Sequence, residues 1–220
     1  MGVFIRGILV VIEGVDGTGK HTQSTALIEY LEKLGHKTSY YSYPDYTSPN
    51  GRRIDAYLHG RFEMDVDRLF DEYLNDMLKD KRKLERDLNE GKVVVIDRYF
   101  MSTIAYQSAQ GFGYQRAKRK EDAAGLPRPD RIIYFEMPLY VSVARKEKQR
   151  AGEMSEKDRF EGDEKIQKGA GFYYGKMMEE GYPTRNWVSI LAEGDVEKVH
   201  EKVVAAVAPL LEKPRLKVKK

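Results

Sequence analysis

Short apolar runs alternate with longer amphipathic segments along the whole chain. Runs rich in β-branched residues predict strands buried on both faces, and these lie at residues 8–12, 37–43, 93–96, 131–135 and 187–191. Between them, apolar residues recur at helical spacing. This spacing predicts a helix that ends near residue 34 and further helices at 51–60, 66–90, 102–109, 139–150, 164–180 and 196–211. Residues 111–129 are predicted to form a polar connection and residues 151–163 a charged loop.

The order of these elements predicts an α/β fold with three layers, in which helices cover both faces of a five-stranded, mainly parallel sheet. We expect one domain across residues 1–220, with a lid at about 150–163 and a basic tail at 213–220. Ligands of such sheets bind beyond the carboxyl ends of the strands. Three segments fall at those ends: the loop after Ile12, residues 43–46, and Asp97-Arg98-Tyr99.

Composition narrows the classes of partner. Of the 220 residues, 41% are hydrophobic and 33% are charged, as in a soluble globular protein, and the formal net charge of +3 is too small to indicate nucleic-acid binding. The absence of cysteine excludes disulfides and thiolate metal sites, and it fits a reducing cytoplasm. No apolar run reaches the length of a membrane span, and residues 1–7 do not resemble a signal peptide. We therefore expect small-molecule partners, without nucleic acid or membrane, and a cytoplasmic location.

A glycine-rich segment follows the first predicted strand and opens the first helix. Its glycines allow backbone N–H groups to point at phosphate oxygens, the helix N-terminus adds positive potential, and Lys20 is placed to reach the β- and γ-phosphates. The pattern predicts a P-loop NTPase fold whose triphosphate site comprises Gly14, Val15, Asp16, Gly17, Thr18, Gly19, Lys20, His21 and Thr22.

His21 stands where this motif usually has a Ser or Thr that touches magnesium. Either Thr22 substitutes for it, or the metal is held through water and phosphates. His21 itself is either an exposed residue of the first helical turn or a nucleotide contact. Carboxylates near the loop are the candidate metal ligands, and these are Asp16, Asp97 and Glu161. Glu13 is either a core-edge carboxylate with a backbone partner or a group that holds a cation or orders water and an arginine.

Arg98 can bridge two phosphate groups through its planar guanidinium, although an Asp97–Arg98 structural ion pair is the alternative. On the helix that follows, Thr103, Tyr106 and Gln107 share one face because they are three and four residues apart. That face presents a hydroxyl, an aromatic wall and an amide able to read the edge of a base.

A group of cations marks the predicted lid, namely Arg145, Lys148, Arg150, Lys157 and Arg159. A solvated charged surface is the ordinary interpretation of such a group. However, Gly17 leaves the P-loop without an arginine, and phosphoryl transfer between two polyanions needs cations on the moving group. A closing lid that brings Arg150 or Arg159 to the site would supply them.

With these motifs in place, the chain resembles the thymidylate kinases, which are P-loop nucleoside monophosphate kinases. The resemblance covers nearly the whole chain and rests on residues 12–20 with Thr22-Gln23, Tyr43-Pro44-Asp45-Tyr46, Asp97-Arg98-Tyr99, Ser102 with Ala105-Tyr106-Gln107, residues 125–130 and Asp158-Arg159-Phe160-Glu161. It implies ATP-dependent phosphorylation of dTMP to dTDP, with Mg²⁺, in a cytoplasmic homodimer.

The resemblance also implies roles for single residues. Asp16 lies at the junction of the two phosphates, Arg98 holds the acceptor phosphate and Arg145 lies against adenine. The acceptor-binding set is Asp16, Tyr46, Tyr73, Arg98, Ser102, Thr103, Tyr106 and Gln107, in which Tyr73 stacks on the base and Tyr106 crowds a ribose 2′-hydroxyl. The catalytic set is Lys20, Asp16, Arg98, Arg150 and Arg159. Because the acceptor oxygen is already ionised near neutral pH, no general base is expected.

Met77 departs from the family, which has an arginine that reads thymine at this position. Two alternatives follow: a preference for dTMP through Gln107 and Arg82, or a kinase for UMP or a wider set of monophosphates. A non-catalytic nucleotide-binding regulator is disfavoured because Lys20, Asp97 and Arg98 are retained. A GTPase switch is disfavoured because the sequence has no Asn-Lys-x-Asp motif.

Overall fold

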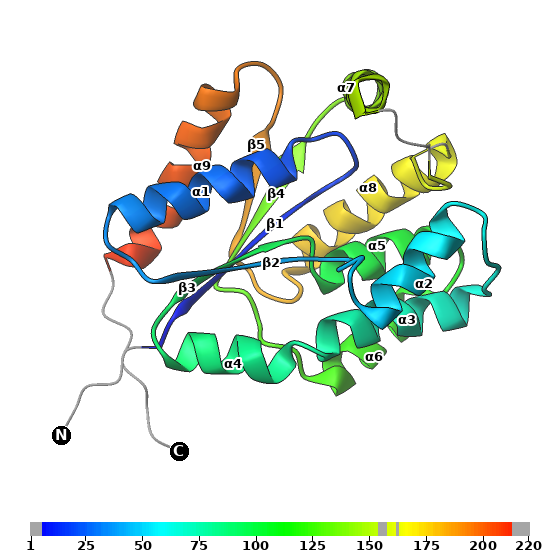
Figure 1. The fold of residues 1–220 in the computed structure, drawn as a ribbon, viewed down its shortest axis with the longest axis horizontal. Helices are drawn as coiled ribbons and strands as arrows, with labels where there is room; N and C mark the ends of the chain where they lie inside the picture. The colour runs from blue at the N-terminus through cyan, green and yellow to red at the C-terminus, as the bar shows by residue number, and fades with distance from the viewer. Residues whose placement is uncertain (1–5, 154–157, 162, 213–220) are drawn as a thin grey trace.

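The computed structural model describes residues 6–153, 158–161 and 163–212 (Figure 1). Within these ranges, five parallel strands form one sheet in the order β2-β3-β1-β4-β5, which confirms the predicted fold class. The strands are β1 (Ile8–Gly14), β2 (Thr38–Ser42), β3 (Val93–Asp97), β4 (Arg131–Glu136) and β5 (Trp187–Leu191). The longest strand, β1, occupies the centre of the sheet and is buried along its whole length.

Alternate side chains of β1 belong to two different hydrophobic clusters, one on each face of the sheet. Leu9 and Val11 pack with one cluster, whereas Val10 and Ile12 pack with the other. The second cluster includes residues of α1 (Lys20–Lys33) and α9 (Val196–Leu211). These two helices cover one face in Figure 1, while α4 (Lys81–Asn89), α5 (Phe100–Ala109) and α8 (Glu164–Glu180) lie on the other. The sequence predicts both layers because a strand buried on both faces needs cover on each side.

The predicted long helix at 66–90 is wrong, since the structure has α3 (Val66–Leu78) and α4 in its place. The break lies at Lys79 and Asp80. The Asp80 N–H donates to the carbonyl of Met77, three residues back, so the turn tightens and a new helix starts. The Lys79 ammonium holds this break through ion pairs with Asp45 (3.3 Å), Asp76 (3.0 Å) and Asp80 (2.9 Å).

The predicted polar connection at 111–129 is also corrected, because residues 114–124 form helix α6 (Tyr114–Ala124). Its buried face consists of Tyr114, Ala117 and Glu121, which is too sparse an apolar stripe to indicate a helix. Two ammonium groups cover the Tyr114 ring, since those of Lys118 and Lys176 lie 5.3 and 4.8 Å from its centre. The other predicted helices are present with small shifts at their ends, and a short α2 (Pro49–Leu58) precedes α3.

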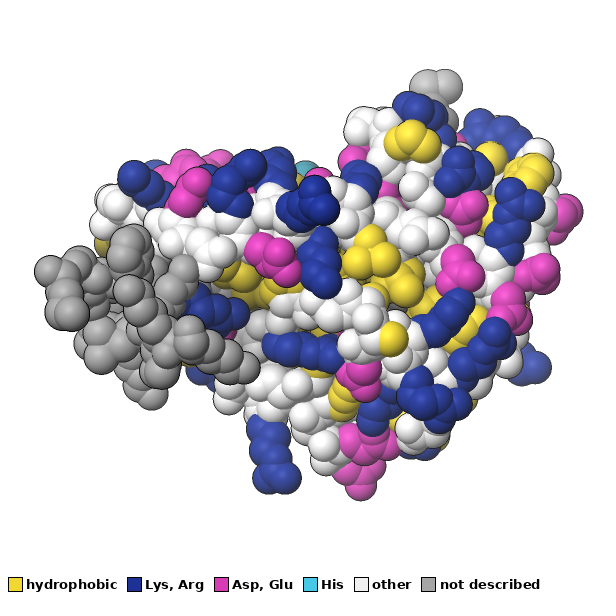
Figure 2. All heavy atoms as spheres, turned by 90° about the horizontal axis from the view of Figure 1, so that it is seen from below, with side chains coloured by type: hydrophobic (Ala, Val, Ile, Leu, Met, Phe, Trp, Pro, Cys, Tyr) yellow, Lys and Arg dark blue, Asp and Glu magenta, His cyan; other side chains and the backbone are white. Residues whose placement is uncertain are grey.

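Helix α7 (Leu139–Glu153) continues past the predicted end at 150, so the charged loop begins later than expected. The remainder of the predicted lid is described only at 158–161 and 163, and the basic tail at 213–220 lies outside the described residues. Among the described residues, no helix is long and apolar enough to cross a membrane. The face seen in Figure 2 mixes basic and acidic side chains, which agrees with the small net charge.

Candidate active site

Three neighbouring strands bring the site together at the carboxyl edge of the sheet. Ile12 of β1 is in register with Asp97 of β3, and Ser42 of β2 is in register with the same residue. The loops that leave these strands surround two cavities. The P-loop cleft, of about 1150 Å³, lies along residues 16–22. The tyrosine cavity, of about 540 Å³, is lined by Tyr43, Tyr46, Tyr73, Tyr99 and Tyr106 among others.

The glycine-rich loop has the local geometry of an anion site. Gly19 is the N-cap of α1 in the left-handed region (φ 84°), and no side chain caps the helix, so its first-turn N–H groups remain available to a ligand. Lys20 is buried and donates to the carbonyl of Val15 (2.8 Å). Burial lowers the pKa of its ammonium to about 8, against the opposing influence of nearby carboxylates.

Gly17 explains why the loop carries no arginine of its own. It has a positive φ of 77°, and a Cβ at this position would lie 2.3 Å from the backbone carbonyl oxygen of Ser142 in α7. No side chain fits there, so any additional positive charge must come from other segments.

The P-loop cleft contains most of the sequence-predicted nucleotide residues. Those that line it are Asp16, Gly17, Gly19, Lys20, His21, Thr22, Asp97, Arg145 and Glu161. Gly14, Val15 and Thr18 do not line it and are buried. His21 is exposed and its Nδ1 lies 3.2 Å from the Tyr40 hydroxyl, while Arg145 donates to the carbonyl of Ala192 (3.0 Å). Sequence reasoning missed Lys146, which lines the cleft and pairs with Glu161 at 2.8 Å.

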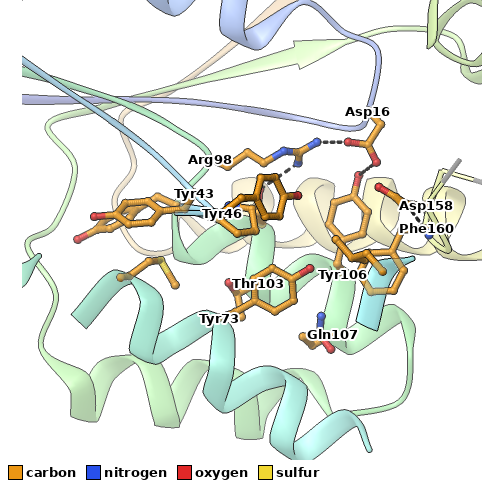
Figure 3. A pocket seen from close by; sticks show the side chains of 15 residues that line it. Asp16, Tyr43, Tyr46, Tyr73, Arg98, Thr103, Tyr106, Gln107, Asp158 and Phe160 are labelled. Carbon is orange, nitrogen blue, oxygen red and sulfur yellow. Dashed lines mark hydrogen bonds and ion pairs between the residues drawn. The ribbon is translucent and has the colours of Figure 1, made fainter. Parts of the chain in front are cut away.

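Asp16 and Arg98 line both cavities and form an ion pair between them (Figure 3). Arg98 also donates to the carbonyl of Gly14 (3.1 Å) and to the Ser102 hydroxyl (3.3 Å). Burial would raise the pKa of Asp16, but the charges of Arg98 and Lys20 outweigh it and lower that pKa to about 2. The carboxylate is therefore ionised and held in place at the junction.

Two further residues that sequence reasoning did not select hold this junction. Gln167 of α8 donates to Asp16 (2.8 Å) and to the carbonyl of Phe160 (2.9 Å). Phe160 stacks on Tyr106 with ring centres 5.8 Å apart. A lone glutamine on an amphipathic helix carries no sequence signal, since only the packing of α8 on α5 brings it to the P-loop.

All the predicted acceptor residues line the tyrosine cavity, namely Asp16, Tyr46, Tyr73, Arg98, Ser102, Thr103, Tyr106 and Gln107. Met77 lines it as well, whereas Arg82 does not and is exposed, so the alternative that Arg82 reads the base is not supported. Figure 3 shows Asp16 and Arg98 on one side of the cavity and Gln107 on the opposite side.

Glu13 is a structural carboxylate rather than a cation ligand. It is fully buried and accepts from the N–H groups of Tyr99 (2.9 Å) and Ser102 (3.3 Å), and from the hydroxyls of Ser102 (2.6 Å) and Tyr174 (2.8 Å). Burial raises its pKa, although these donors oppose the rise. The carboxylate ties the end of β1 to the N-terminus of α5, next to Arg98.

The three candidate metal ligands do not form a cluster. Among the described residues, no group of three or more His, Asp or Glu side chains is placed to hold a metal. Asp16 is paired with Arg98 and Glu161 with Lys146. Asp97 fits a metal site best because it is a buried carboxylate that lines the P-loop cleft, as Thr22 does. One carboxylate together with substrate phosphates is the donor set that Mg²⁺ commonly takes.

The structure does not bring Arg159, one of the two predicted lid arginines, into the site. Arg159 donates to the carboxylate of Glu63 (2.9 Å) and lies over the ring of Tyr57 (4.6 Å), outside the lining of both cavities. The side chain of Arg150 on α7 lies outside the described residues. Asp158, from the same segment, does line both cavities, and burial together with the charge of Asp16 raises its pKa to about 6.

Comparison with known proteins gives one consistent result. The family model for thymidylate kinase matches residues 12–203. The probable thymidylate kinase of Pyrococcus abyssi is 34% identical over 209 residues, which cover 92% of this chain and 97% of the relative. The human thymidylate kinase is 28% identical over 199 residues, covering 90% and 88%. The solved structure of thymidylate kinase from Candida albicans shares the fold, with a TM-score of 0.73 at 18% identity and coverage of 96% and 97%.

Proposed function

Since the chain belongs to the thymidylate kinase family and is a kinase that phosphorylates dTMP with ATP as donor, we propose that its two cavities divide this reaction between them. The P-loop cleft takes ATP and the tyrosine cavity takes the monophosphate. The observation that carries this proposal is the Asp16–Arg98 pair, because both residues line both cavities. The two phosphate groups that react must meet where the cavities meet.

On the donor side, the uncapped N–H groups of α1 and the Lys20 ammonium bind the triphosphate. The Lys20 ammonium donates to the carbonyl of Val15 within the loop. When ATP binds, a phosphate oxygen takes the place of this carbonyl as the acceptor. Arg145 lies against adenine in this proposal, which is supported by its position in the lining of the cleft next to the loop that follows β5. Lys146 supplies positive charge that the sequence alone assigned to Arg150 or Arg159.

On the acceptor side, Arg98 holds the 5′-phosphate through its planar fork, while Asp16 keeps the guanidinium in place. Tyr46 lies near that phosphate, and Tyr73 supplies a ring on which the base stacks. Tyr106, whose hydroxyl lies 3.2 Å from Asp16, closes the side of the sugar. The Ser102 hydroxyl accepts a hydrogen bond from the Arg98 guanidinium and thereby helps to hold it in position.

The chemistry is an in-line transfer of the γ-phosphoryl group from ATP to an oxygen of the 5′-phosphate. That oxygen is ionised at neutral pH, since the second phosphate pKa is about 6, so the protein needs no general base. Catalysis then consists of positioning and neutralisation of charge on the moving group. Mg²⁺, held by Asp97 and the substrate phosphates with Thr22 near, would neutralise charge on the triphosphate when bound.

Two further parts of the proposal concern the enzyme as a whole. The family resemblance supports a homodimer in the cytoplasm, in which residues 150–163 act as a lid on one kinase domain spanning the chain. Light scattering coupled to gel filtration tests the dimer, because a monomeric mass near 25.4 kDa would contradict it.

The proposal is tested by the rate of ADP release with ATP and dTMP. We expect Lys20→Ala to raise the KM for ATP or lower kcat by at least about a hundredfold, as for loss of one charged transition-state donor. Lys33→Ala is the matched control, since Lys33 lies in the last turn of the same helix and is exposed. Unchanged ATP kinetics in the Lys20 variant, or equal losses in both variants, would contradict the donor site.

A further inference from the structure

The side chain of Gln107 is buried in the wall of the tyrosine cavity without a hydrogen-bond partner. Its exposed fraction is 0%, and neither its Nε2 nor its Oε1 has a partner within the described part of the chain. A buried amide that makes no hydrogen bond costs free energy in the empty protein. Figure 3 shows this amide directed into the cavity, on the far side from Asp16 and Arg98. It is therefore placed to meet the edge of a bound base rather than its phosphate.

The part of the cavity around Gln107 carries no charge. The charged residues that line the tyrosine cavity are Asp16, Arg98 and Asp158, and all three also line the P-loop cleft. They therefore belong to the phosphate junction. Besides Gln107, the uncharged and non-aromatic residues of the lining are Pro44, Leu58, Met77, Ser102 and Thr103. The Ser102 hydroxyl is engaged by Arg98, Glu13 and Tyr174 beside the phosphate junction. The Thr103 hydroxyl is then the aliphatic hydroxyl left for the base, and a hydroxyl both donates and accepts.

An amide and a hydroxyl do not distinguish the two kinds of pyrimidine edge. A 4-oxopyrimidine presents an acceptor at O4 beside a donor at N3–H, whereas a 4-aminopyrimidine presents a donor at the amino group beside an acceptor at N3. The Gln107 amide offers one donor and one acceptor side by side, and rotation of the amide by half a turn exchanges them. A fixed cation would instead offer donors only and would select the 4-oxo edge.

From this arrangement we propose that the acceptor site reads pyrimidines through Gln107 and phosphorylates both 4-oxo and 4-amino deoxynucleoside monophosphates, dCMP as well as dTMP and dUMP. The inference rests on the proposed function, because it concerns the acceptor of the same reaction. With dCMP, the bond between the γ-phosphorus and the bridging β–γ oxygen breaks, and its electron pair leaves with ADP. A 5′-phosphate oxygen of dCMP forms the new bond to phosphorus, and the products are dCDP and ADP.

The first test compares kcat/KM for dTMP, dUMP and dCMP with the wild-type enzyme at saturating ATP. The informative pair is dUMP and dCMP, because neither has a 5-methyl group. We expect the two values to agree within about tenfold, whereas a site built to read one edge rejects the other by about 10⁴-fold. If dTMP is turned over but kcat/KM for dCMP lies more than about tenfold below that for dUMP, this inference is overturned while the proposed function stands. Absence of turnover with dTMP overturns the proposed function.

Variants test whether Gln107 is the group that reads the base. We expect Gln107→Leu to lower kcat/KM for dUMP and dCMP alike by about ten- to hundredfold, since both lose the same two hydrogen bonds. Gln110→Leu is the matched control, because Gln110 caps the same helix outside the cavity lining and should change either value by less than about twofold. A Gln107 variant that retains both activities overturns the assignment.

Met77 provides the converse variant. It lines the cavity and is buried, so Met77→Arg adds a group that only donates hydrogen bonds near the base. We expect kcat/KM for dCMP to fall at least about tenfold relative to dUMP, while Met77→Leu leaves the ratio unchanged. An unchanged ratio in a folded Met77→Arg protein contradicts the inference. If that variant does not fold, the wild-type substrate comparison and Gln107→Leu decide the question.

Discussion

Arg98 combines a strained backbone with the central cation of the site, and a pair of substitutions separates the two effects. It is the one residue other than glycine with a positive φ (61°) in the described part of the chain. Placing an L-residue in this left-handed region costs about 1–2 kcal/mol. Both Arg98→Ala and Arg98→Gly remove the guanidinium and its bonds to Asp16, Gly14 and Ser102, so that loss cancels between them. Only Arg98→Gly also relieves the backbone.

Two opposing contributions set the difference in stability between the two variants. Relief of the left-handed conformation contributes about 1–2 kcal/mol in favour of Arg98→Gly, while the greater freedom of glycine in the unfolded chain removes about 0.5–1 kcal/mol. We therefore expect Arg98→Gly to be more stable than Arg98→Ala by about 0.5–1 kcal/mol. In ADP-release assays both variants should lose at least about a hundredfold in kcat, since each lacks the cation that lines both cavities and that we propose binds the reacting phosphates.

Urea unfolding followed by far-ultraviolet circular dichroism measures the difference in stability between the two variants, and a coupled ADP assay measures their kcat. Equal stability of the two variants would refute the claim that this turn is strained. A near wild-type rate in either variant would remove Arg98 from the catalytic machinery, whatever its effect on stability. If Arg98→Gly is the more stable variant and both variants lose kcat, the left-handed backbone at residue 98 is retained for function at a cost in stability.

Three further substitutions probe the frame around the site. Gly17→Ala should lose at least about 1 kcal/mol more stability than Gly19→Ala. Both positions have a positive φ, but only at Gly17 does a Cβ meet a backbone oxygen, that of Ser142. Equal losses by urea unfolding would show that the contact between Gly17 and the Ser142 carbonyl is not tight. Glu13→Gln should cost about 1–2 kcal/mol and Glu13→Leu about 3 kcal/mol or more, since leucine removes the acceptor of the Tyr99 N–H and of one of the Ser102 and Tyr174 hydroxyls, only one of which can donate to the other; similar stabilities of the two variants would contradict this role. Burial raises the pKa of Glu121 to about 7 despite its pairing with Arg128, so the native state binds a proton more readily than the unfolded state, whose pKa is near 4.5. The stability that Glu121 contributes should therefore fall, by at most about 3 kcal/mol, as pH rises from about 4.5 to 7, and Glu121→Gln should lack this fall; parallel stability profiles of the two proteins between pH 5 and 8 would disprove it.

The sequence by itself determined the fold class, and it predicted the glycine-rich loop and the residues that line the tyrosine cavity. A strand such as β1 is buried on both faces because every residue of it is apolar or adjoins the loop, and this property can be read from the residues alone. The motif residues follow strand ends directly, so their common location at one edge follows from parallel order. The break at Lys79–Asp80 and the helix α6 could not be predicted, because contacts with distant segments stabilise them. Lys79 pairs with Asp45 at the break, and residues of α8 contact α6 through the Lys118–Glu180 ion pair and the Lys176 ammonium over the Tyr114 ring.

Only the tertiary structure decided which side chains meet. Glu13 was ambiguous in the sequence until the N-terminus of α5 was seen to surround it with donors. Gln167 and Lys146 reach the junction from α8 and α7, far along the chain from the P-loop, and no local pattern marks either. Arg159 carries the right charge but is held at Glu63 and Tyr57, outside both cavities. Local patterns specify elements because backbone and burial preferences act over a few residues. Contacts between distant elements depend on how those elements pack. For the same reason, only the tertiary structure shows that the part of the tyrosine cavity around Gln107 is uncharged.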